Sequence, residues 1–312
     1  MSGPGARLFG LNLDTRFRFS TGLLPPSGPP DLAFEVFGEA PPAPPGPPLY
    51  ASPVRSLHGE PGFSLFREGA VDILRFPGPL EFRVDGPRIR ARAPAGTPPH
   101  RLEIAFLGAV MAFLLEKRGA CALHASAVAT EGGTILFLGG NRGGKTALAA
   151  ALLRSGRDLI ADDIAALEAT REGLIVRPAY PSMRMWPDEA DWFLGTHEAL
   201  PLVHPDLDKR RVPVGPGGFG RFLDRMVPLR RVYLPERGGT GPPKILPVPP
   251  SEALFALLAG SFLARVMETA GDRARRLDLL ARVAREDRVR RLLLPDGFDR
   301  LPEVVETVLA DR

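Results

Sequence analysis

The sequence predicts an α/β fold, in which a smaller β-rich N-terminal domain precedes a larger domain that mixes helices and strands. In the first 98 residues, short runs of partly alternating apolar and polar residues are broken by proline, as in short strands. After Pro98–Pro99, apolar residues first recur at helical spacing. A strand, a glycine-rich loop and a helix then follow one another over residues 134–155. We therefore expect two domains, comprising residues 1–98 and 99–312.

The elements expected in the N-terminal domain are all strands. The alternation predicts them at residues 16–20, 32–36, 63–67, 70–76, 80–84 and 89–93. The proline-rich stretch 41–48 is compatible with a polyproline ligand, but a stiff surface loop is the simpler interpretation.

Helical and strand patterns alternate in the larger domain. They predict a helix at 101–117, strands at 123–129 and 134–138, and a helix at 145–155 that ends at Gly156. A further strand, 157–161, ends at Asp162 and Asp163, and segments 164–169 and 174–177 indicate a hairpin. The C-terminal third predicts helices at 250–267 and 272–285, a strand at 289–294 and a last helix from residue 301.

The composition is that of an ordinary globular protein. Of 312 residues, 44% are hydrophobic and 24% are charged, which is enough to bury a sizeable core. Cys121 is the only cysteine, so an intramolecular disulfide is excluded and we expect a small buried thiol. The longest apolar stretch, 104–115, is too short to span a membrane, and the N-terminus lacks a signal-peptide pattern. We expect a cytoplasmic protein without a membrane partner.

The net charge of +4 gives no reason to expect a nucleic-acid partner, because no recognised nucleic-acid module accompanies it. Only 4 of the 40 basic residues are lysine, so each lysine draws attention. The sequence leaves the formation of a homo-oligomer open.

A glycine-rich segment carries the clearest functional signal. It matches the pattern G-x-x-x-x-G-K-[ST] between an expected strand and an expected helix, as a phosphate-binding P-loop does. Glycines let the backbone N–H groups point at phosphates, and the start of the helix adds partial positive charge. Lysine would reach the β- and γ-phosphates, and threonine would ligate Mg²⁺. The expected ligand is ATP with Mg²⁺, held by Gly139, Gly140, Asn141, Arg142, Gly143, Gly144, Lys145 and Thr146.

Asp162 and Asp163 form the second candidate group. They end the strand that follows the helix after the glycine-rich loop, so a short α/β unit can return them to the phosphate side of the sheet. One carboxylate there would hold Mg²⁺, and the second would accept a hydroxyl proton. An exposed turn at the end of a strand is the alternative interpretation.

Two further groups are weaker candidates. His124 lies in a short apolar strand before the glycine-rich loop, where a histidine is more often part of the core than catalytic. The basic cluster 209–211 is a candidate for binding nucleotide or an acidic substrate, with Arg210 as the expected nucleotide-binding residue. A solvated loop explains the cluster equally well. Arg184 is a similar but weaker candidate.

Three segments in this order resemble the HPr kinase/phosphorylase family. They are residues 123–128 with His124, the glycine-rich loop, and residues 159–164 with the pair Asp162–Asp163. The likeness includes HPr-kinase-related proteins found with peptide natural-product pathways, among them lasso-peptide tailoring kinases. It covers residues 120–190 well and residues 247–309 more loosely.

The resemblance implies a P-loop kinase core like the nucleotide-binding core of phosphoenolpyruvate carboxykinase, with transfer of phosphate from ATP–Mg²⁺ to a serine hydroxyl. Carried over, Lys145 and Thr146 would bind phosphate and metal. Asp162 and Asp163 would share the metal-ligand and general-base roles, with Asp162 as the metal ligand. His124 would support the pair.

The chain departs from the family pattern at three places. Asn141 and Arg142 stand where the family has Ser and Gly. The segment 182–184 has Ser-Met-Arg where the family has Glu-x-Arg, so one expected metal ligand is missing. The family's C-terminal substrate-handling signature is not found, so HPr itself is not the expected substrate.

We therefore expect an ATP-dependent kinase that acts on a hydroxyl, in particular serine, of a peptide or small protein. Two alternatives stay open: a nucleotide-binding accessory protein of a peptide-modification pathway, and a kinase for the hydroxyl of a small metabolite. The presence of His124 with Asp162 and Asp163 favours chemistry over binding alone.

Overall fold

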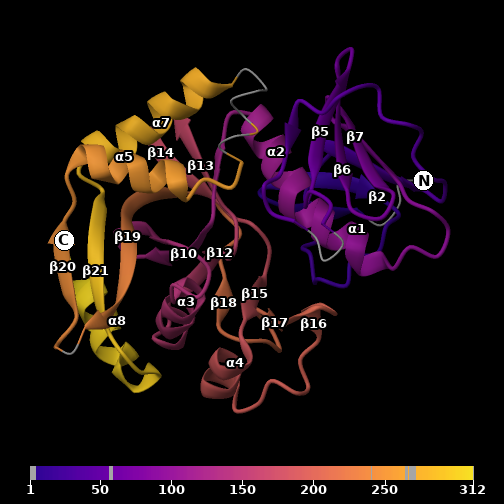
Figure 1. Cartoon of the computed structure of the whole chain (residues 1–312). Coiled ribbons are helices and arrows are strands. Elements are labelled where there is room, and N and C mark those ends of the chain that lie inside the picture. The colour runs from indigo at the N-terminus through magenta and orange to yellow at the C-terminus, as the bar shows by residue number, and fades with distance from the viewer. Residues whose placement is uncertain (1–4, 56–58, 240, 264–265, 267–271, 312) are drawn as a thin grey trace.

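The computed structural model describes residues 5–55, 59–239, 241–263, 266 and 272–311 (Figure 1). Within these residues the fold is mixed α/β, with two large sheets, one small sheet and more strand than helix. The α/β class expected from the sequence is confirmed at this level. No helix in the described part of the chain is long and apolar enough to cross a membrane.

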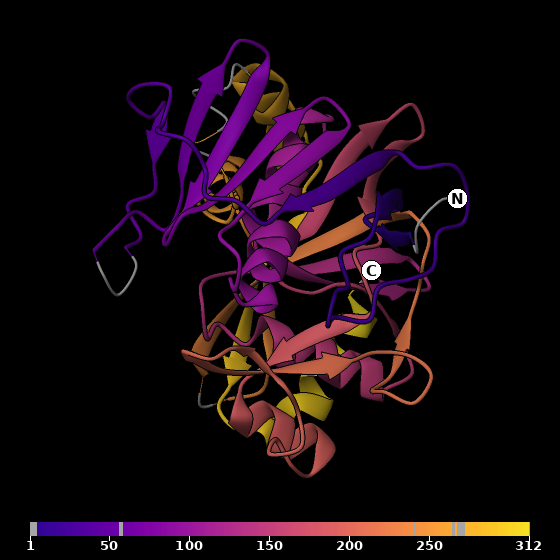
Figure 2. The same cartoon turned by 90° about the vertical axis from the view of Figure 1, so that its right-hand side faces the viewer.

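An eight-stranded sheet forms most of the N-terminal part (Figure 2). Its strand order is β1-β2-β3-β8-β7-β6-β5-β4. Leu65, Leu74 and Phe82 lie opposite one another on three neighbouring strands and are buried in the core. The strands are β1 (Ala6–Leu8), β2 (Leu11–Thr15), β3 (Leu32–Phe37), β4 (Tyr50–Ala51), β5 (Ser64–Glu68), β6 (Val71–Phe76), β7 (Leu80–Asp85) and β8 (Arg88–Arg92).

The strand expected at 16–20 is wrong, since β2 ends at Thr15. The backbone N–H groups of Ser20 and Thr21 instead donate to the buried carboxylate of Glu103, at 2.7 and 2.8 Å. A side chain more than eighty residues away therefore replaces the neighbouring strand that the alternating pattern implied.

A kinked helical segment lies between the N-terminal sheet and the rest of the molecule (Figures 1 and 2). It consists of α1 (Pro99–Ala105), the π-helical turn η1 (Phe106–Val110) and α2 (Met111–Lys117), and the kink is at Gly108. The ring of Phe106 stacks on that of Phe34 with centroids 4.3 Å apart. One continuous core joins the two parts, and the division at residues 98/99 stays a prediction.

The larger part is built on a ten-stranded mixed sheet with the path β18-β12-β10-β11-β19-β14-β13-β9, to which β21 and β20 add beside β19. Along β11, Ile135 and Phe137 enter one core, whereas Leu136 and Leu138 enter the other, so this strand is buried on both faces. The strands are β9 (Cys121–Leu123), β10 (Ala125–Thr130), β11 (Gly133–Leu138), β12 (Asp158–Ala161), β13 (Ala165–Thr170), β14 (Gly173–Arg177), β18 (Arg221–Phe222), β19 (Val227–Gly239), β20 (Lys244–Pro247) and β21 (Val289–Pro295).

Helices cover both faces of this sheet. Helices α3 (Lys145–Arg154) and α8 (Leu301–Ala310), the second preceded by the turn η2 (Phe298–Arg300), pack on one face. Helices α5 (Pro250–Ala259) and α7 (Arg273–Arg285) pack on the other. A small sheet of β15 (Ser182–Met185), β17 (Leu207–Pro213) and β16 (Leu202–His204), with α4 (Pro187–Leu194), adjoins α3.

The helix expected at 250–267 is shorter than predicted. Helix α5 ends at Ala259, and the carbonyl of Gly260 accepts a hydrogen bond from the backbone N–H of His124 at 2.7 Å. This contact and the bridge between Leu123 and Ser261 turn the chain away from the helix axis. Residues 264–265 and 267–271 of the expected helix lie outside the described residues.

We predict that Phe106→Ala lowers the free energy of unfolding by about 3–5 kcal/mol, because it removes a fully buried ring between the sheet and the helices. Urea denaturation followed by circular dichroism measures this change. The matched control is Phe255→Ala, whose side chain is 73% exposed and should change stability by less than about 0.5 kcal/mol. Equal effects of the two substitutions would contradict a core that continues through Phe106.

Candidate active site

Strand directions bring three predicted segments to one edge of the central sheet. Strand β10 is antiparallel to β11 on one side and to β12 on the other, so β11 and β12 run the same way. Their carboxyl ends therefore lie at the edge where β10 begins. The glycine-rich loop after β11, Asp162 and Asp163 after β12, and His124 before β10 meet there.

The glycine-rich loop turns tightly before α3. The N–H of Gly143 donates to the carbonyl of Gly140 at 3.2 Å, and a Cβ at Gly143 would lie 3.1 Å from that oxygen. Gly144, immediately before α3, has φ of +81°, in the left-handed region that favours glycine. Helix α3 begins without a side-chain cap and without an acidic residue in its first turn. Its first backbone N–H groups are therefore not neutralised by a side chain.

Lys145 folds back over the loop. Its Nζ donates to the carbonyl of Gly140 at 2.7 Å, and the residue is 7% exposed. Burial lowers the pKa of this amine from its ordinary value, and Lys209 lowers it further, while Asp162 and Asp163 oppose the shift. The ammonium group therefore lies over the loop, and the negative charges of Asp162 and Asp163 stabilise its positive charge.

The carboxylate of Asp162 joins three other elements. Its Oδ1 accepts hydrogen bonds from Ser126 Oγ of β10 at 2.6 Å and from Thr146 Oγ1 of α3 at 3.1 Å. Its Oδ2 accepts from the backbone N–H of Arg184 in β15 at 2.8 Å. Asp162 is 4% exposed and is held on both oxygens. The hydrogen bond with Thr146 places side by side the two residues that the sequence analysis named as metal ligands.

Asp163 faces His124 and Arg184. It has φ of +73°, which is uncommon for a residue with a side chain. Its Oδ2 accepts from Arg184 Nη1 at 2.7 Å, and its Oδ1 lies 3.6 Å from His124 Nδ1. Burial alone would raise the pKa of Asp163, but the positive charges of Arg184, Lys209 and Lys145 lower it. The carboxylate therefore stays ionised.

His124 is the single residue between the end of β9 and the start of β10. Its Nδ1 lies 3.0 Å from the backbone carbonyl of Asp163, which can only accept a hydrogen bond, so Nδ1 carries the proton. Burial lowers the pKa of the imidazole, although Asp163 opposes the shift. This leaves Nε2 as an acceptor on a ring whose orientation Asp163 fixes.

The small sheet adds an aromatic ring and a lysine to the site. Trp186 follows β15, and its ring carries the guanidinium of Arg142 from the loop at 4.4 Å and Nζ of Lys209 at 5.1 Å from the centroid. The charge of Lys209 also contributes to the pKa of Asp163 and of Lys145, behind the larger effect of burial. Lys209 therefore belongs to the site.

Arg210 lies on the opposite face of the same strand. It pairs with Met185 in register, next to the buried pair Met183 and Val212, and its Nη1 donates to the carbonyl of Leu200 at 3.4 Å. Because side chains alternate along a strand, Lys209 and Arg211 share one face and Arg210 takes the other. Among the described contacts, none joins Arg210 to the glycine-rich loop.

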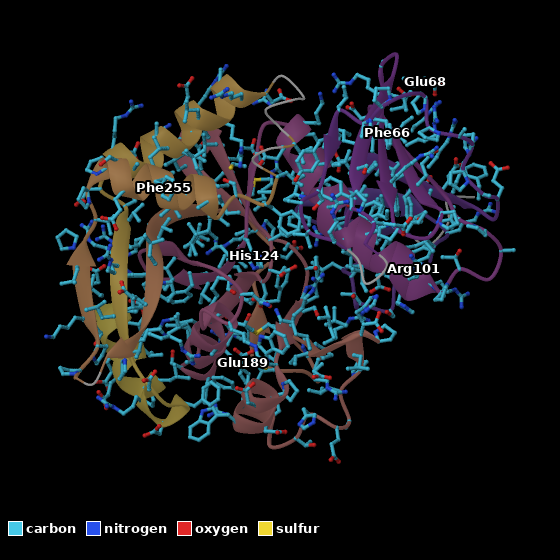
Figure 3. The ribbon with its side chains drawn as sticks, in the orientation of Figure 1. Phe66, Glu68, Arg101, His124, Glu189 and Phe255 are labelled. Atoms are coloured by element: carbon cyan, nitrogen blue, oxygen red, sulfur yellow. The ribbon has the colours of Figure 1, made fainter. Side chains whose placement is uncertain are left out.

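Glu189 is a further carboxylate at the site that the sequence interpretation did not include. It lies in the first turn of α4, and its Oε2 accepts from the backbone N–H of Trp186 at 2.9 Å. Figure 3 shows His124 near the middle of the molecule and Glu189 below it. Burial, with a smaller contribution from Asp162, raises the pKa of Glu189 to about 7. The local sequence around Glu189 gives no sign of this proximity, because it depends on how distant segments fold together.

The oxygen atoms of Thr146 and Asp162 are suited to Mg²⁺ that is also bound by phosphate and water. They are too few to hold a metal ion by themselves. Across the described residues, no group of three His, Cys, Asp or Glu side chains is arranged to hold a metal ion. Thr146 and Asp162 offer a hydroxyl and a carboxylate within 3.1 Å of each other. Mg²⁺ commonly uses one or two such ligands together with phosphate oxygens and water.

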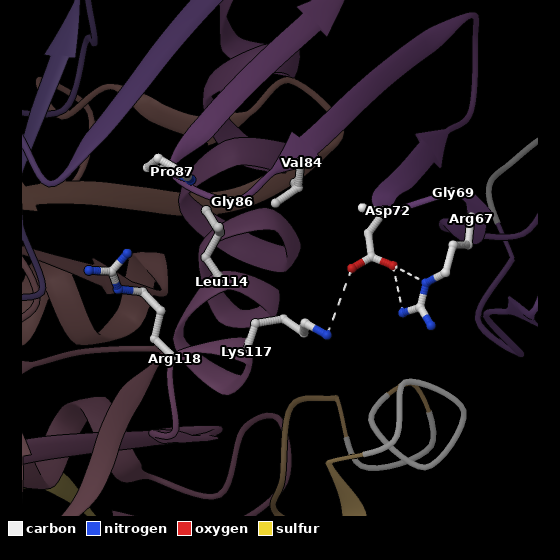
Figure 4. Close-up of a pocket in the computed structure, with 10 residues that line it drawn as sticks. Arg67, Gly69, Asp72, Val84, Gly86, Pro87, Leu114, Lys117 and Arg118 are labelled. Carbon is white, nitrogen blue, oxygen red and sulfur yellow. Dashed lines mark hydrogen bonds and ion pairs between the residues drawn. The ribbon is translucent and has the colours of Figure 1, made fainter.

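A cavity lies away from the candidate active site, between two turns of the N-terminal sheet and the end of α2 (Figure 4). Its volume is about 530 Å³, and none of the predicted site residues lines it. Arg67 donates to Asp72 at 2.7 Å, and Lys117 lies 4.0 Å from the same carboxylate. Because Asp72 already partly balances these cations, we assign the cavity no ligand.

Comparisons with known proteins add no assignment: no family model matches the chain, and no curated protein matches it.

The pKa of Glu189 predicts a specific dependence of stability on pH. Because burial raises this pKa from 4.5 to about 7, the folded state binds the proton more tightly than the unfolded state. The contribution of Glu189 to the free energy of unfolding should therefore fall by a few kcal/mol as pH rises from about 4.5 to 7. Glu189→Gln should remove this component, so the variant gains stability relative to wild type over that range.

Urea titrations of both proteins from pH 4.5 to 7.5 measure the difference, and Glu172→Gln, which changes an exposed carboxylate, is the control. A difference between Glu189→Gln and wild type that stays constant with pH would contradict the assignment.

Proposed function

We propose that this chain is an ATP-dependent kinase that transfers the γ-phosphoryl group to a hydroxyl of a peptide or protein. The observation that carries the proposal is the meeting of Lys145, Thr146, Asp162, Asp163 and His124 at one edge of a sheet. The class of acceptor, a serine hydroxyl in particular, rests on the resemblance to HPr kinase-like proteins.

The glycine-rich loop would hold the nucleotide phosphates. The free N–H groups at the start of α3 offer an anion-binding position, and Lys145 can exchange the carbonyl of Gly140 for phosphate oxygens. Because the lysine is already over the loop, little reorganisation accompanies that exchange. Positioning and charge stabilisation supply most of the catalysis in phosphoryl transfer.

Thr146 and Asp162 would hold Mg²⁺ beside the phosphates. When bound, the ion would neutralise charge on the β- and γ-phosphates. Ser126 donates to one oxygen of the Asp162 carboxylate and the backbone N–H of Arg184 donates to the other, so together they orient it. Asp162 is therefore the candidate for the metal side of the site.

Asp163 and His124 would face the acceptor hydroxyl. The hydroxyl proton would pass to the carboxylate of Asp163 as the oxygen bonds to the γ-phosphorus, and the bond from that phosphorus to the bridging oxygen of ADP would break. His124 would orient the carboxylate. Arg184 keeps the carboxylate ionised but makes it a weak base. A weak base is compatible with a loose transition state, in which the acceptor oxygen forms little bond before the leaving group departs.

Substitutions at the site should separate nucleotide binding from phosphoryl transfer. Lys145→Ala should weaken the binding of Mg–ATP at least about tenfold, because it removes a charge-assisted contact to phosphate. Asp162→Asn and Asp163→Asn should keep most nucleotide affinity but slow transfer by about 10² to 10⁴. Calorimetry measures binding, and mass spectrometry of a serine-containing peptide incubated with ATP and Mg²⁺ measures transfer.

Full transfer by the double Asn variant would remove both aspartates from the mechanism. Nucleotide binding by the wild type without transfer to any peptide would favour a metabolite kinase or an accessory binding protein instead.

Lys209 and Arg210 provide a matched pair of neighbouring cations. Lys209→Gln should reduce transfer at least about tenfold, because its ammonium group lies at the charged centre of the site. Arg210→Gln removes an equal charge from the opposite face of the strand and should change transfer by less than about threefold. Steady-state rates at saturating ATP measure both effects, and an equal loss in the two variants would disprove the assignment of Lys209.

A further inference from the structure

Two arginines face each other across the small sheet next to the candidate active site. Arg184 of β15 and Arg211 of β17 are direct partners in an antiparallel ladder, so their side chains share one face. Both are largely buried, with side chains 19% and 11% exposed. Like charges directly opposite each other are unfavourable unless each has a carboxylate of its own.

Each arginine does have a carboxylate of its own. Arg184 pairs with Asp163 at 2.7 Å, and Arg211 lies 3.4 Å from Oε1 of Glu103. A small cavity of about 10 Å³ is lined by Arg184, Arg211 and Glu103, so Arg184 lies close to the pair formed by Arg211 and Glu103. The arrangement divides four charges into two pairs.

Glu103 is held firmly by the N-terminal part of the chain. It is 1% exposed, and its two oxygens accept hydrogen bonds from the backbone N–H groups and hydroxyls of Ser20 and Thr21. Ser20 Oγ also accepts from Arg211. Residues from the start of the chain therefore fix the charge that compensates Arg211.

We propose that Glu103 is a positioning residue for the active site: by pairing with Arg211, it keeps Arg184 on Asp163. If Glu103 were uncharged, Arg211 and Arg184 would be buried side by side. Of the two carboxylates that pair with them, only that of Asp163 would remain charged. The two arginines would then compete for Asp163, and its alignment with His124 would change. The N-terminal part thus helps to position the residues of the site. The expected effect on the rate of transfer rests on the proposed kinase function.

The kinetic test compares Glu103→Gln with wild type. The variant should lose at least about tenfold in kcat for transfer, while the dissociation constant of Mg–ATP stays within about twofold. Glu103→Gln combined with Arg211→Gln removes both charges of the pair and should restore kcat to within about threefold of wild type. All proteins are measured at a temperature where circular dichroism shows them folded.

Glu81→Gln is the matched control, since Glu81 is also a buried carboxylate of the N-terminal part and pairs with Arg75 at 2.6 Å. It should leave kcat unchanged. An unchanged kcat in Glu103→Gln, a parallel loss of nucleotide binding, an equal loss in Glu81→Gln, or a double variant as slow as the single one would overturn the proposal.

A crystal structure of Glu103→Gln tests the inference even if the wild type transfers no phosphate. The expected result is loss of the 2.7 Å contact between Arg184 Nη1 and Asp163 Oδ2, with Arg211 moved toward Asp163. Retention of that contact would overturn the positioning role. Absence of transfer by the wild type would instead count against the proposed function alone.

Discussion

The geometry of the candidate site depends on the hydrogen bonds that the Asp162 carboxylate accepts. It ends β12 and is hydrogen-bonded to Ser126 at the start of β10, to Thr146 in α3 and to the backbone of Arg184 in β15. Four elements from different parts of the chain are thus fixed around one charged group. Because the group is buried, each of these hydrogen bonds is costly to leave unmade. The position of the glycine-rich loop relative to Asp163 and His124 follows from it.

Some cations around this carboxylate are paired with aspartates, and others lie on an aromatic ring. Lys145 is compensated by the two aspartates, and Asp163 is compensated by Arg184. Arg142 and Lys209 rest on an aromatic ring instead of a carboxylate, so they remain available to an incoming anion. An ATP phosphate chain would meet these cations together with the start of α3. This distribution of charge supports a site for a highly charged ligand whose charge shifts during a reaction.

The sequence predicted the parts of the site that depend on local pattern. The loop, its flanking strand and helix, and the aspartates at the end of β12 followed from motif and periodicity, and strand directions brought them together. The roles of Trp186 and Glu189, and the choice of Lys209 over Arg210 within the basic cluster, could not be predicted in this way. They depend on a small sheet whose pairing joins distant segments. The strand wrongly expected at 16–20 has the same cause, since Glu103 takes up the backbone N–H groups of Ser20 and Thr21. Long-range polar contacts leave little trace in local alternation.

A crystal structure with Mg²⁺ and a non-hydrolysable ATP analogue would show directly whether the glycine-rich loop binds nucleotide phosphates. We expect the β-phosphate at the first N–H groups of α3, with Lys145 moved from the carbonyl of Gly140 onto phosphate oxygens. We also expect the metal ion beside Thr146 and Asp162. A nucleotide bound away from the loop, for example in the cavity at the end of α2, would contradict the account. An empty loop that keeps the contact between Lys145 and Gly140 at saturating nucleotide would contradict it equally.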